Sequence, residues 1–285
     1  MLGGDSHLKR IDDFSIKYWG SEILENEKYI FIPNDIFERL ENNKFMSGRH
    51  KLFSVVYLYV ICWVYRYGKS IDIYKNNNNF SEIIKEISGI NRGEKRLDYI
   101  ISKNGVLDIL KITKTINISK TPATYNLDNF TKFVTFNTVE ECVKEGLMSK
   151  PPNRILTKEP LIGTRNRVVN GVTYLGTFQD VEYTFKFSMK DYIYMSSILN
   201  LNFETIGFYL YLMSLSSKYG GVIKRSRKGM AKDIGVTEKT ITKYKKILKE
   251  HGLIREYYDK PFESKEINII IVRGSDLYAS TKKSS

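Results

Sequence analysis

An internal repeat constrains the fold of this chain more than any other feature. The segment 85–107 (KEISGINRGEKRLDYIISKNGVL) aligns without a gap with the segment 232–254 (KDIGVTEKTITKYKKILKEHGLI). The apolar positions and the final glycines coincide in the pairs Ile87–Ile234, Leu97–Tyr244, Ile100–Ile247, Ile101–Leu248 and Gly105–Gly252. A repeat of this kind predicts one supersecondary unit formed twice.

Two elements that precede these segments repeat as well. VVYLYVICWVYRYGK (55–69) aligns with GFYLYLMSLSSKYGG (207–221), and YIFIPNDIF (29–37) resembles YTFKFSMKD (183–191). The first copy carries five extra residues, which fall at the Asn-rich stretch YKNNNNF. Three matches in the same order predict an α+β fold, mainly α, built from two copies of one unit.

The second copy has clear helix signals. Thr237 is a good N-cap, and Gly252 suits a left-handed C-cap. The spacing of the apolar residues between them predicts one inward stripe, formed by Ile241, Tyr244, Ile247 and Leu248. A shorter helix should precede it, with Met230, Ala231 and Ile234 inward, and two strands should follow it.

This order of helix, turn, helix and hairpin resembles the winged helix-turn-helix family, and the resemblance spans Asn202 to Val272. In that family the second helix of the pair enters the major groove of DNA. With the repeat, the resemblance implies two winged helix-turn-helix domains. The expected division is an N-terminal extension (1–27), a first winged-helix domain (28–120), a connector with a strand, a short helix and a basic loop (121–182), a second winged-helix domain (183–275) and a flexible tail (276–285).

The charge of the chain points to a polyanionic partner. Lys and Arg total 45 against 32 Asp and Glu, a formal net charge of +13. Between Lys218 and Glu250 there are eleven Lys and Arg but three acids. A solvated helix face usually interleaves acids with its lysines, whereas clustered positive charge is what the neutralisation of phosphates requires. We therefore expect double-stranded DNA as the partner.

Roles for individual residues follow from this expectation. In the second copy we expect base contacts from Lys239, Thr240 and Lys243, phosphate contacts from Lys246, Arg225, Arg227 and Lys228, and wing contacts from Lys260 and Lys265. In the first copy we expect base contacts from Asn91, Arg92, Lys95 and Arg96, with Tyr99 also outward and a wing that includes Lys111, Lys114 and Lys120.

The first copy is less basic, so two uses stay open for it: weaker DNA binding, or a homodimer contact. The connector also has two interpretations. It is either a disordered tether or a phosphate-tracking strap, made basic by Lys150, Arg154, Lys158, Arg165 and Arg167. A hairpin turn is predicted within it at Asn170-Gly171.

The sequence gives no sign of an enzyme, a cofactor or a metal centre. It lacks the motifs of P-loop enzymes, serine hydrolases, zinc peptidases and dinucleotide-binding proteins. Cys62 and Cys142 have no metal-ligand spacing around them, and the three histidines are scattered. The longest apolar run, Leu52 to Tyr65, is too short to cross a bilayer, so we expect a cytoplasmic protein without a membrane partner.

Tandem winged helices without a ligand domain resemble the theta-type replication initiators of plasmids and phages. That resemblance implies sequence-specific binding to repeated origin sites, together with the recruitment of host replication proteins. Two alternatives stay open: a transcription regulator that uses the same DNA contacts, and a winged-helix module that binds other proteins.

Overall fold

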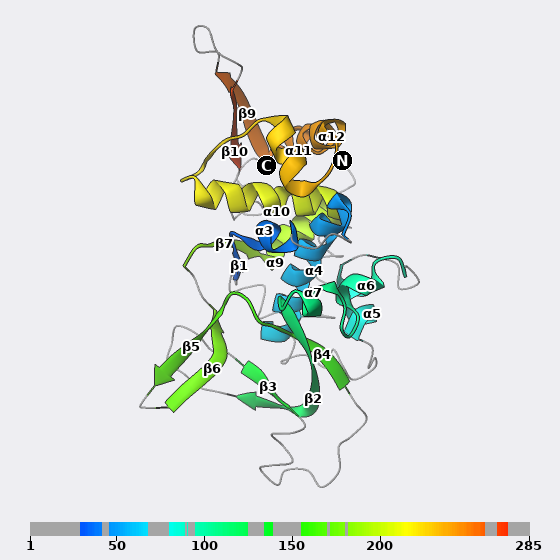
Figure 1. The fold of residues 1–285 in the computed structure, drawn as a ribbon, viewed down its shortest axis with the longest axis vertical. Helices are drawn as coiled ribbons and strands as arrows, with labels where there is room; N and C mark the ends of the chain where they lie inside the picture. Colours follow the sequence, from blue (N-terminus) through cyan, green and yellow to red (C-terminus); the bar gives the residue numbers. More distant parts are fainter. Residues whose placement is uncertain are drawn as a thin grey trace, which may run out of the picture. The chain divides into compact units, whose positions relative to one another are not determined.

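The computed structural model describes residues 29–41, 46–67, 80–88, 90, 95–124, 134–138, 155–169, 172–179, 182–259 and 267–272. The expected N-terminal extension and flexible tail lie outside the described residues. Contacts divide the chain into two units (Figure 1). Unit 1 joins residues 27–56 with 181–285, and unit 2 contains residues 57–180.

The elements follow one another in this order (Figure 1): β1 (Tyr29–Pro33), α3 (Ile36–Glu41), α4 (Gly48–Tyr67), α5 (Phe80–Ile87), α6 (Asp98–Ile101), α7 (Val106–Ile109), β2 (Thr113–Thr124), β3 (Val134–Thr138), β4 (Ile155–Pro160), β5 (Thr164–Val169), β6 (Val172–Gln179), β7 (Thr184–Ser188), α9 (Met189–Ile193), η2 (Tyr194–Ile198), α10 (Phe203–Lys218), β8 (Val222–Lys224), α11 (Arg227–Ile234), α12 (Glu238–Glu250), β9 (Ile254–Asp259) and β10 (Ile267–Val272).

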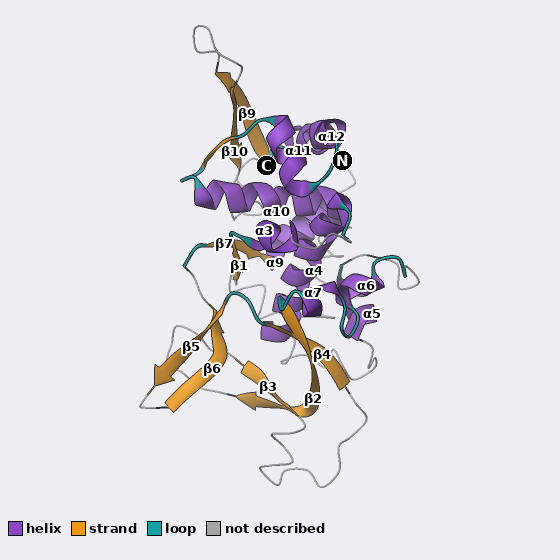
Figure 2. Ribbon diagram, viewed as in Figure 1, coloured by secondary structure: helices purple, strands orange, loops and turns teal. Residues whose placement is uncertain are grey.

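Helices and small antiparallel sheets are both present, as an α+β fold requires (Figure 2). Two sheets belong to unit 1: the pair β1–β7 and a three-stranded sheet in the order β8-β10-β9. Two belong to unit 2: a three-stranded sheet in the order β3-β2-β4 and the pair β5–β6. No helix in the described part of the chain is long and apolar enough to span a membrane.

The pair β1–β7 brings together the two segments that the sequence matches as copies of each other. Tyr29 lies opposite Ser188, and Pro33 lies opposite Thr184. A helix follows each strand, α3 after β1 and α9 after β7, as the pattern of a strand and a helix cap predicts. Ser188 caps α9 by accepting a hydrogen bond of 3.0 Å from the Asp191 N–H.

Helix α10 forms the centre of unit 1. Asn202 caps it by accepting a hydrogen bond of 2.9 Å from the Thr205 N–H. The helix is apolar almost all round and is buried over most of its length, as expected for a helix covered on several sides. Phe208 of α10 packs at 5.9 Å from Tyr211 and at 5.5 Å from Tyr244 of α12, measured between ring centroids.

Unit 2 contains the second half of α4 and a buried ion pair between α7 and β4. Trp63 donates a hydrogen bond of 2.6 Å to the Tyr59 hydroxyl inside α4. Lys158 of β4 is 1 % exposed and pairs with Asp108 of α7. Thr113 and Thr115 donate to the same carboxylate at 2.7 and 2.6 Å. Burial opposes the ionisation of Asp108, but these three partners outweigh it and lower the pKa of that carboxyl.

The first copy departs from the second after its apolar stripe. Leu97, Ile100 and Ile101 are buried, as predicted. However, helix α6 covers only Asp98–Ile101, whereas the matching α12 has thirteen residues. Gly105 has an extended backbone with φ −70°, while Gly252 is left-handed with φ +66°. Helix α7 then follows in the first copy, where the second copy continues directly into strand β9.

The alignment itself explains the short helix. The residue that aligns with the N-cap Thr237 is Ile90, which has no side-chain oxygen to accept from a helix amide. The residue that aligns with the left-handed Gly235 is Ser88. The stripe therefore repeats without the glycine that ends α11 and the threonine that starts α12 in the second copy.

The structure groups the expected domains differently. Residues 27–56, expected in the first winged-helix domain, belong to unit 1 because β1 pairs with β7. The division falls inside α4, between Val56 and Tyr57. Much of the expected connector belongs to unit 2, because β4 pairs with β2 over six residue pairs.

The connector is not a disordered tether over its described residues, which form β3, β4, β5 and β6. The predicted hairpin is confirmed by the antiparallel pairing of β5 with β6, in which Val169 lies opposite Val172. The turn residues Asn170 and Gly171 lie outside the described residues. Lys158, expected among the connector's surface cations, is buried instead, because it serves the Asp108 carboxylate.

Candidate nucleic-acid interface

The first helix of the pair, α11, begins and ends as its sequence predicts. Ser226 caps it by accepting a hydrogen bond of 3.0 Å from the Gly229 N–H. It ends at Gly235, whose φ of +84° is left-handed and whose N–H donates to the Ala231 carbonyl oxygen at 2.8 Å. The three predicted inward residues, Met230, Ala231 and Ile234, are buried.

The second helix, α12, starts at the predicted cap. The Thr237 hydroxyl accepts a hydrogen bond of 3.2 Å from the Thr240 N–H. The stripe is confirmed for Ile241, Tyr244 and Leu248, which are buried, whereas Ile247 is half-buried. The helix is therefore oriented with one defined face toward α10 and the opposite face toward solvent.

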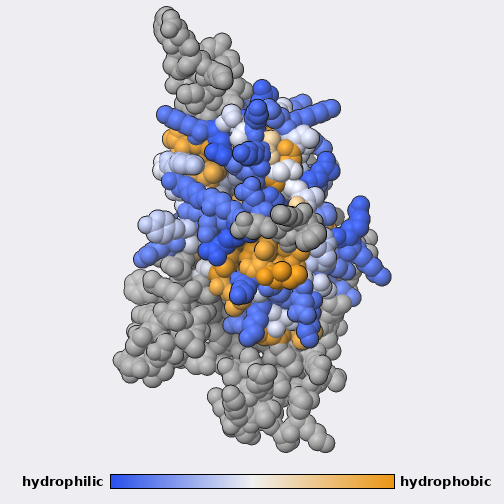
Figure 3. All heavy atoms as spheres, viewed as in Figure 1, coloured by the Kyte–Doolittle hydropathy of each residue, from blue (hydrophilic) through white to orange (hydrophobic). Residues whose placement is uncertain are grey.

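The solvent face of α12 carries the lysines that the sequence assigned to DNA. Lys239, Lys243 and Lys246 are all exposed. Lys246 lies 3.8 Å from Glu250 in an exposed pair, which contributes little to stability. Thr240 is half-buried, and its hydroxyl lies 2.9 Å from that of Thr237, so it takes part in the helix cap. Hydrophilic side chains predominate over the α11 and α12 region in Figure 3, with some apolar ones between them.

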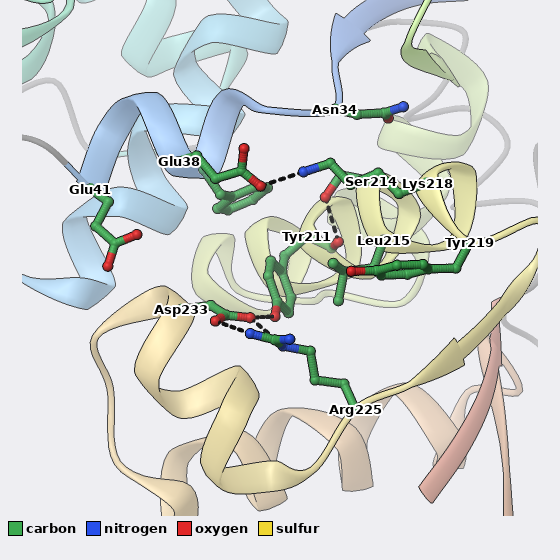
Figure 4. A pocket seen from close by; sticks show the side chains of 11 residues that line it. Asn34, Glu38, Glu41, Tyr211, Ser214, Leu215, Lys218, Tyr219, Arg225 and Asp233 are labelled. Atoms are coloured by element: carbon green, nitrogen blue, oxygen red, sulfur yellow. Dashed lines mark hydrogen bonds and ion pairs between the residues drawn. The ribbon is translucent and has the colours of Figure 1, made fainter.

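Arg225 has an internal partner that the sequence analysis did not foresee. Its Nε donates a hydrogen bond of 2.6 Å to Asp233, and its Nη2 pairs with the other oxygen of the same carboxylate. The Tyr211 hydroxyl donates to Asp233 as well. In Figure 4 the Arg225 and Tyr211 side chains converge on Asp233, beside a pocket of about 100 Å³. Arg225 therefore has a structural role, which ties β8 and α10 to α11, and its phosphate contact stays a prediction.

This cluster also changes proton affinities. The hydrogen bond to Asp233 raises the pKa of Arg225, so the guanidinium stays charged. Burial raises the pKa of Tyr211, and the neighbouring Asp233 adds to that shift. Tyr211 therefore stays a neutral donor to the carboxylate, and neither group is a candidate for acid–base chemistry at neutral pH.

Lys245 is a second residue with an ion-pair partner that the sequence does not predict. It lies on the inner side of α12, where its side chain is 5 % exposed, and it pairs with Glu256 of β9. Lys249 lies 3.2 Å from the other oxygen of Glu256. Burial opposes the ionisation of Glu256, but the two lysines outweigh it and lower the pKa of the carboxyl. This ion pair joins the helix to the sheet.

Six cations between Lys218 and Glu250 remain exposed and have no ion-pair partner among the described residues: Lys224, Arg227, Lys228, Lys232, Lys239 and Lys243. Of the three acids in this segment, Asp233 is held by Arg225 and Glu250 by Lys246. With the paired groups set aside, six exposed cations and one exposed acid, Glu238, remain in this segment.

The remaining predicted residues belong to unit 2 or lie outside the described residues. Lys260 and Lys265, expected in the wing, and Asn91 and Arg92 lie outside the described residues. Lys95 and Arg96 are exposed but precede α6 instead of lying on its front turn. Their expected place on a reading helix is therefore wrong, for the capping reason given above. Arg165 and Arg167 lie on β5, with Arg165 opposite Phe178 and Arg167 opposite Tyr174 of β6.

The ion pairs of Arg225 and Lys245 could be predicted only in part from the sequence. Asp233 follows Arg225 by eight residues, and no helical spacing pairs residues that far apart. The two side chains meet because β8 and α11 place them together. Lys245 shares the face of Ile241 and Leu248, so its inward position could have been predicted from the helical period. Its partner Glu256 could not.

Among the described residues, no three His, Cys, Asp or Glu side chains are grouped so that they could hold a metal ion. Comparisons with protein-family models, with curated proteins and with solved structures each find no match to the chain. The functional argument therefore depends on the geometry and charge of the helix pair.

Proposed function

We propose that residues 203–272 form a winged helix-turn-helix that binds double-stranded DNA sequence-specifically, with α12 in the major groove. The observation that carries the proposal is the exposed, unpaired cations of α11, α12 and β8, presented by a helix pair whose other face is buried. The order of elements supports it: α10, β8, α11, α12, β9 and β10, with a sheet in the order β8-β10-β9. Helices of this kind read base edges from their N-terminal half.

The roles of the individual cations divide by position. Lys239 and Lys243 lie in the first half of α12 and are placed to reach base edges. Arg227 and Lys228 lie in the first turn of α11, where the positive end of the helix also favours phosphate. Lys224 at the end of β8 and Lys232 in the second half of α11 add phosphate contacts.

Within this function we propose a replication initiator of a plasmid, phage or similar element, which also recruits host replication proteins. The support is the repeat and the resemblance it carries. The other winged helix of such an initiator would be the first copy, in which helix α4 carries a Tyr-Leu-Tyr motif that repeats that of α10.

Salt dependence tests the binding. A protein that neutralises about six phosphates should show a slope of log affinity against log salt near −5. We expect this slope for a duplex of mixed sequence, measured by fluorescence anisotropy between ~50 and ~200 mM salt. A slope near zero, or no binding at the lower salt, would contradict the proposal and favour a module that binds proteins.

A further inference from the structure

The first turn of α4 packs on the turn between α11 and α12. A Cβ built on Gly48 would lie 2.1 Å from the carbonyl oxygen of Gly235, so the two backbones are in direct contact. One turn later, a Cβ on Gly207 of α10 would lie 2.7 Å from the Leu52 carbonyl oxygen. The start of α4 is thus part of the surface around the helix pair, although it is far away in the sequence.

Lys51 brings an ammonium group to this contact. The residue is 7 % exposed, and its Nζ lies 3.9 Å from the position that a Cβ on Gly235 would take. Its side chain has no hydrogen-bond or ion-pair partner among the described residues. The stem of Lys51 is buried, but its Nζ is not among the fully buried polar atoms that lack a partner, so the ammonium reaches solvent. It is therefore open to an anionic partner from outside the chain.

Two carboxylates on the neighbouring elements are engaged with other groups. Glu204 accepts a hydrogen bond of 2.7 Å from Tyr244 and lies 3.9 Å from Arg49. Asp233, two residues before Gly235, is held by Arg225 and Tyr211. The positive charge of Lys51 is therefore not neutralised by the elements packed around it.

Two helix N-termini meet at the same place. The amides of Gly48 and Arg49 begin α4, and no hydrogen-bond acceptor for them lies among the described residues. Thr237, the N-cap of α12, follows Gly235 by two residues. The positive ends of both helices therefore add to the charge of Lys51, a combination that favours a phosphate group.

We propose that Lys51 and the first turn of α4 form a phosphate-binding site beside the turn of the helix pair, occupied by a backbone phosphate of the DNA that α12 reads. This inference rests on the proposed function. It adds to the interface a residue that precedes every DNA contact expected from the sequence, the first of which is Asn91. The competing role for Lys51 is structural, since an ammonium also compensates the negative C-terminal end of α11.

The test compares full-length variants by the slope of log affinity against log salt, measured for each on the same duplex of mixed sequence. Lys51→Met keeps an apolar stem of similar length and removes the charge. We expect the slope to fall in magnitude by about 0.9, the contribution of one phosphate contact. Lys51→Arg should keep the wild-type slope, and so should Lys103→Met, which removes an exposed lysine from unit 2. A folded Lys51→Met protein with the wild-type slope would overturn the site.

A second measurement does not depend on the folding of a variant. Hydrogen exchange of the wild-type amides from Gly48 to Leu52 should slow when the duplex is added, and unchanged exchange would overturn the site. Adding inorganic phosphate at constant ionic strength distinguishes a DNA phosphate from free phosphate as the ligand. We expect inorganic phosphate to leave this exchange unchanged. Slowing as large as that caused by the duplex would assign the site to free phosphate. If the wild-type protein shows no salt-dependent DNA binding, the proposed function fails first.

Discussion

At the scale of single residues, the lysines of α12 fall into two classes that the sequence alone does not separate. Lys245 is buried against Glu256, while Lys239 and Lys243 are exposed and have no ion-pair partner in the described part of the chain. Burial and pairing decide which of these charges is free for a ligand. Mutations in the two classes should therefore have different effects.

An exposed lysine should affect binding and leave stability alone. We expect Lys243→Ala to weaken binding to the cognate site by about 1–3 kcal/mol, with no change in thermal unfolding. Lys103→Ala, at an exposed lysine of unit 2, is the matched control. Titrations of the cognate duplex at one salt concentration would measure the difference, and equal affinities would remove Lys243 from the interface.

The buried pair should affect stability instead, with a defined pH dependence. Glu256→Gln leaves Lys245 buried without a counter-charge, which we expect to cost about 3–5 kcal/mol at neutral pH. The pKa of Glu256 is lowered in the folded state, so its contribution is complete above the unfolded value near 4.3 and is lost as the pH falls through the folded value. The variant and wild type should therefore converge in acid.

Urea unfolding of both proteins at pH 7 and at successively lower pH would measure this convergence. Glu250→Gln is the control, because Glu250 is 57 % exposed beside Lys246 and should contribute little at any pH. A stability difference for Glu256→Gln that stays constant down to pH 3 would contradict the assignment of the ion pair.

At the scale of elements, the sequence predicts those features of a helix or strand that are determined by residues close together in the chain. The start of α12 is set by Thr237 and its inner face by residues within four positions of one another, so both could be predicted. The repeated stripe predicted a longer helix at α6, whereas a local signal, Ile90 in place of the capping threonine, indicated a later start. The strand β8 and its Arg225–Asp233 pair depend on contacts between elements, which no local pattern contains.

The cap of α12 gives a prediction at this scale. Thr237→Ala should destabilise unit 1 by about 1 kcal/mol, because the Thr240 amide loses its acceptor. Thr242→Ala is a matched change on the same helix, at a hydroxyl that bonds to the Glu238 carbonyl oxygen within the helix. Denaturant unfolding would compare the two. A cost for Thr242→Ala as large as that for Thr237→Ala would argue against the capping role.

At the scale of the whole molecule, the chain is not a simple succession of two domains. Strand β1 contributes to unit 1, where it pairs with β7 more than 150 residues later. This long-range pairing was not predicted, although the sequence similarity of the two strands was visible. The stability of the proposed DNA-binding helices should therefore depend on the N-terminal part of the chain.

A substitution in β1 tests that dependence. Ile30 is fully buried, so Ile30→Asp should unfold unit 1 and abolish DNA binding by placing an unpaired charge in the core. Ile109→Asp makes the same change at an isoleucine of unit 2 that is 68 % exposed, and it should be tolerated. Circular dichroism and binding titrations would follow both. Normal binding by a folded Ile30→Asp protein would contradict the role of β1.

The central claim is that α12 reads the sequence of double-stranded DNA. Selection of bound fragments from randomly sheared DNA of the source organism, at about 150 mM salt to suppress non-specific binding, tests it most directly. We predict the recovery of tandem repeats beside an AT-rich stretch, and the loss of that enrichment when Lys239 and Lys243 are both changed to alanine. A single palindrome over a promoter would point to a transcription regulator. No enrichment by the wild-type protein would contradict the claim.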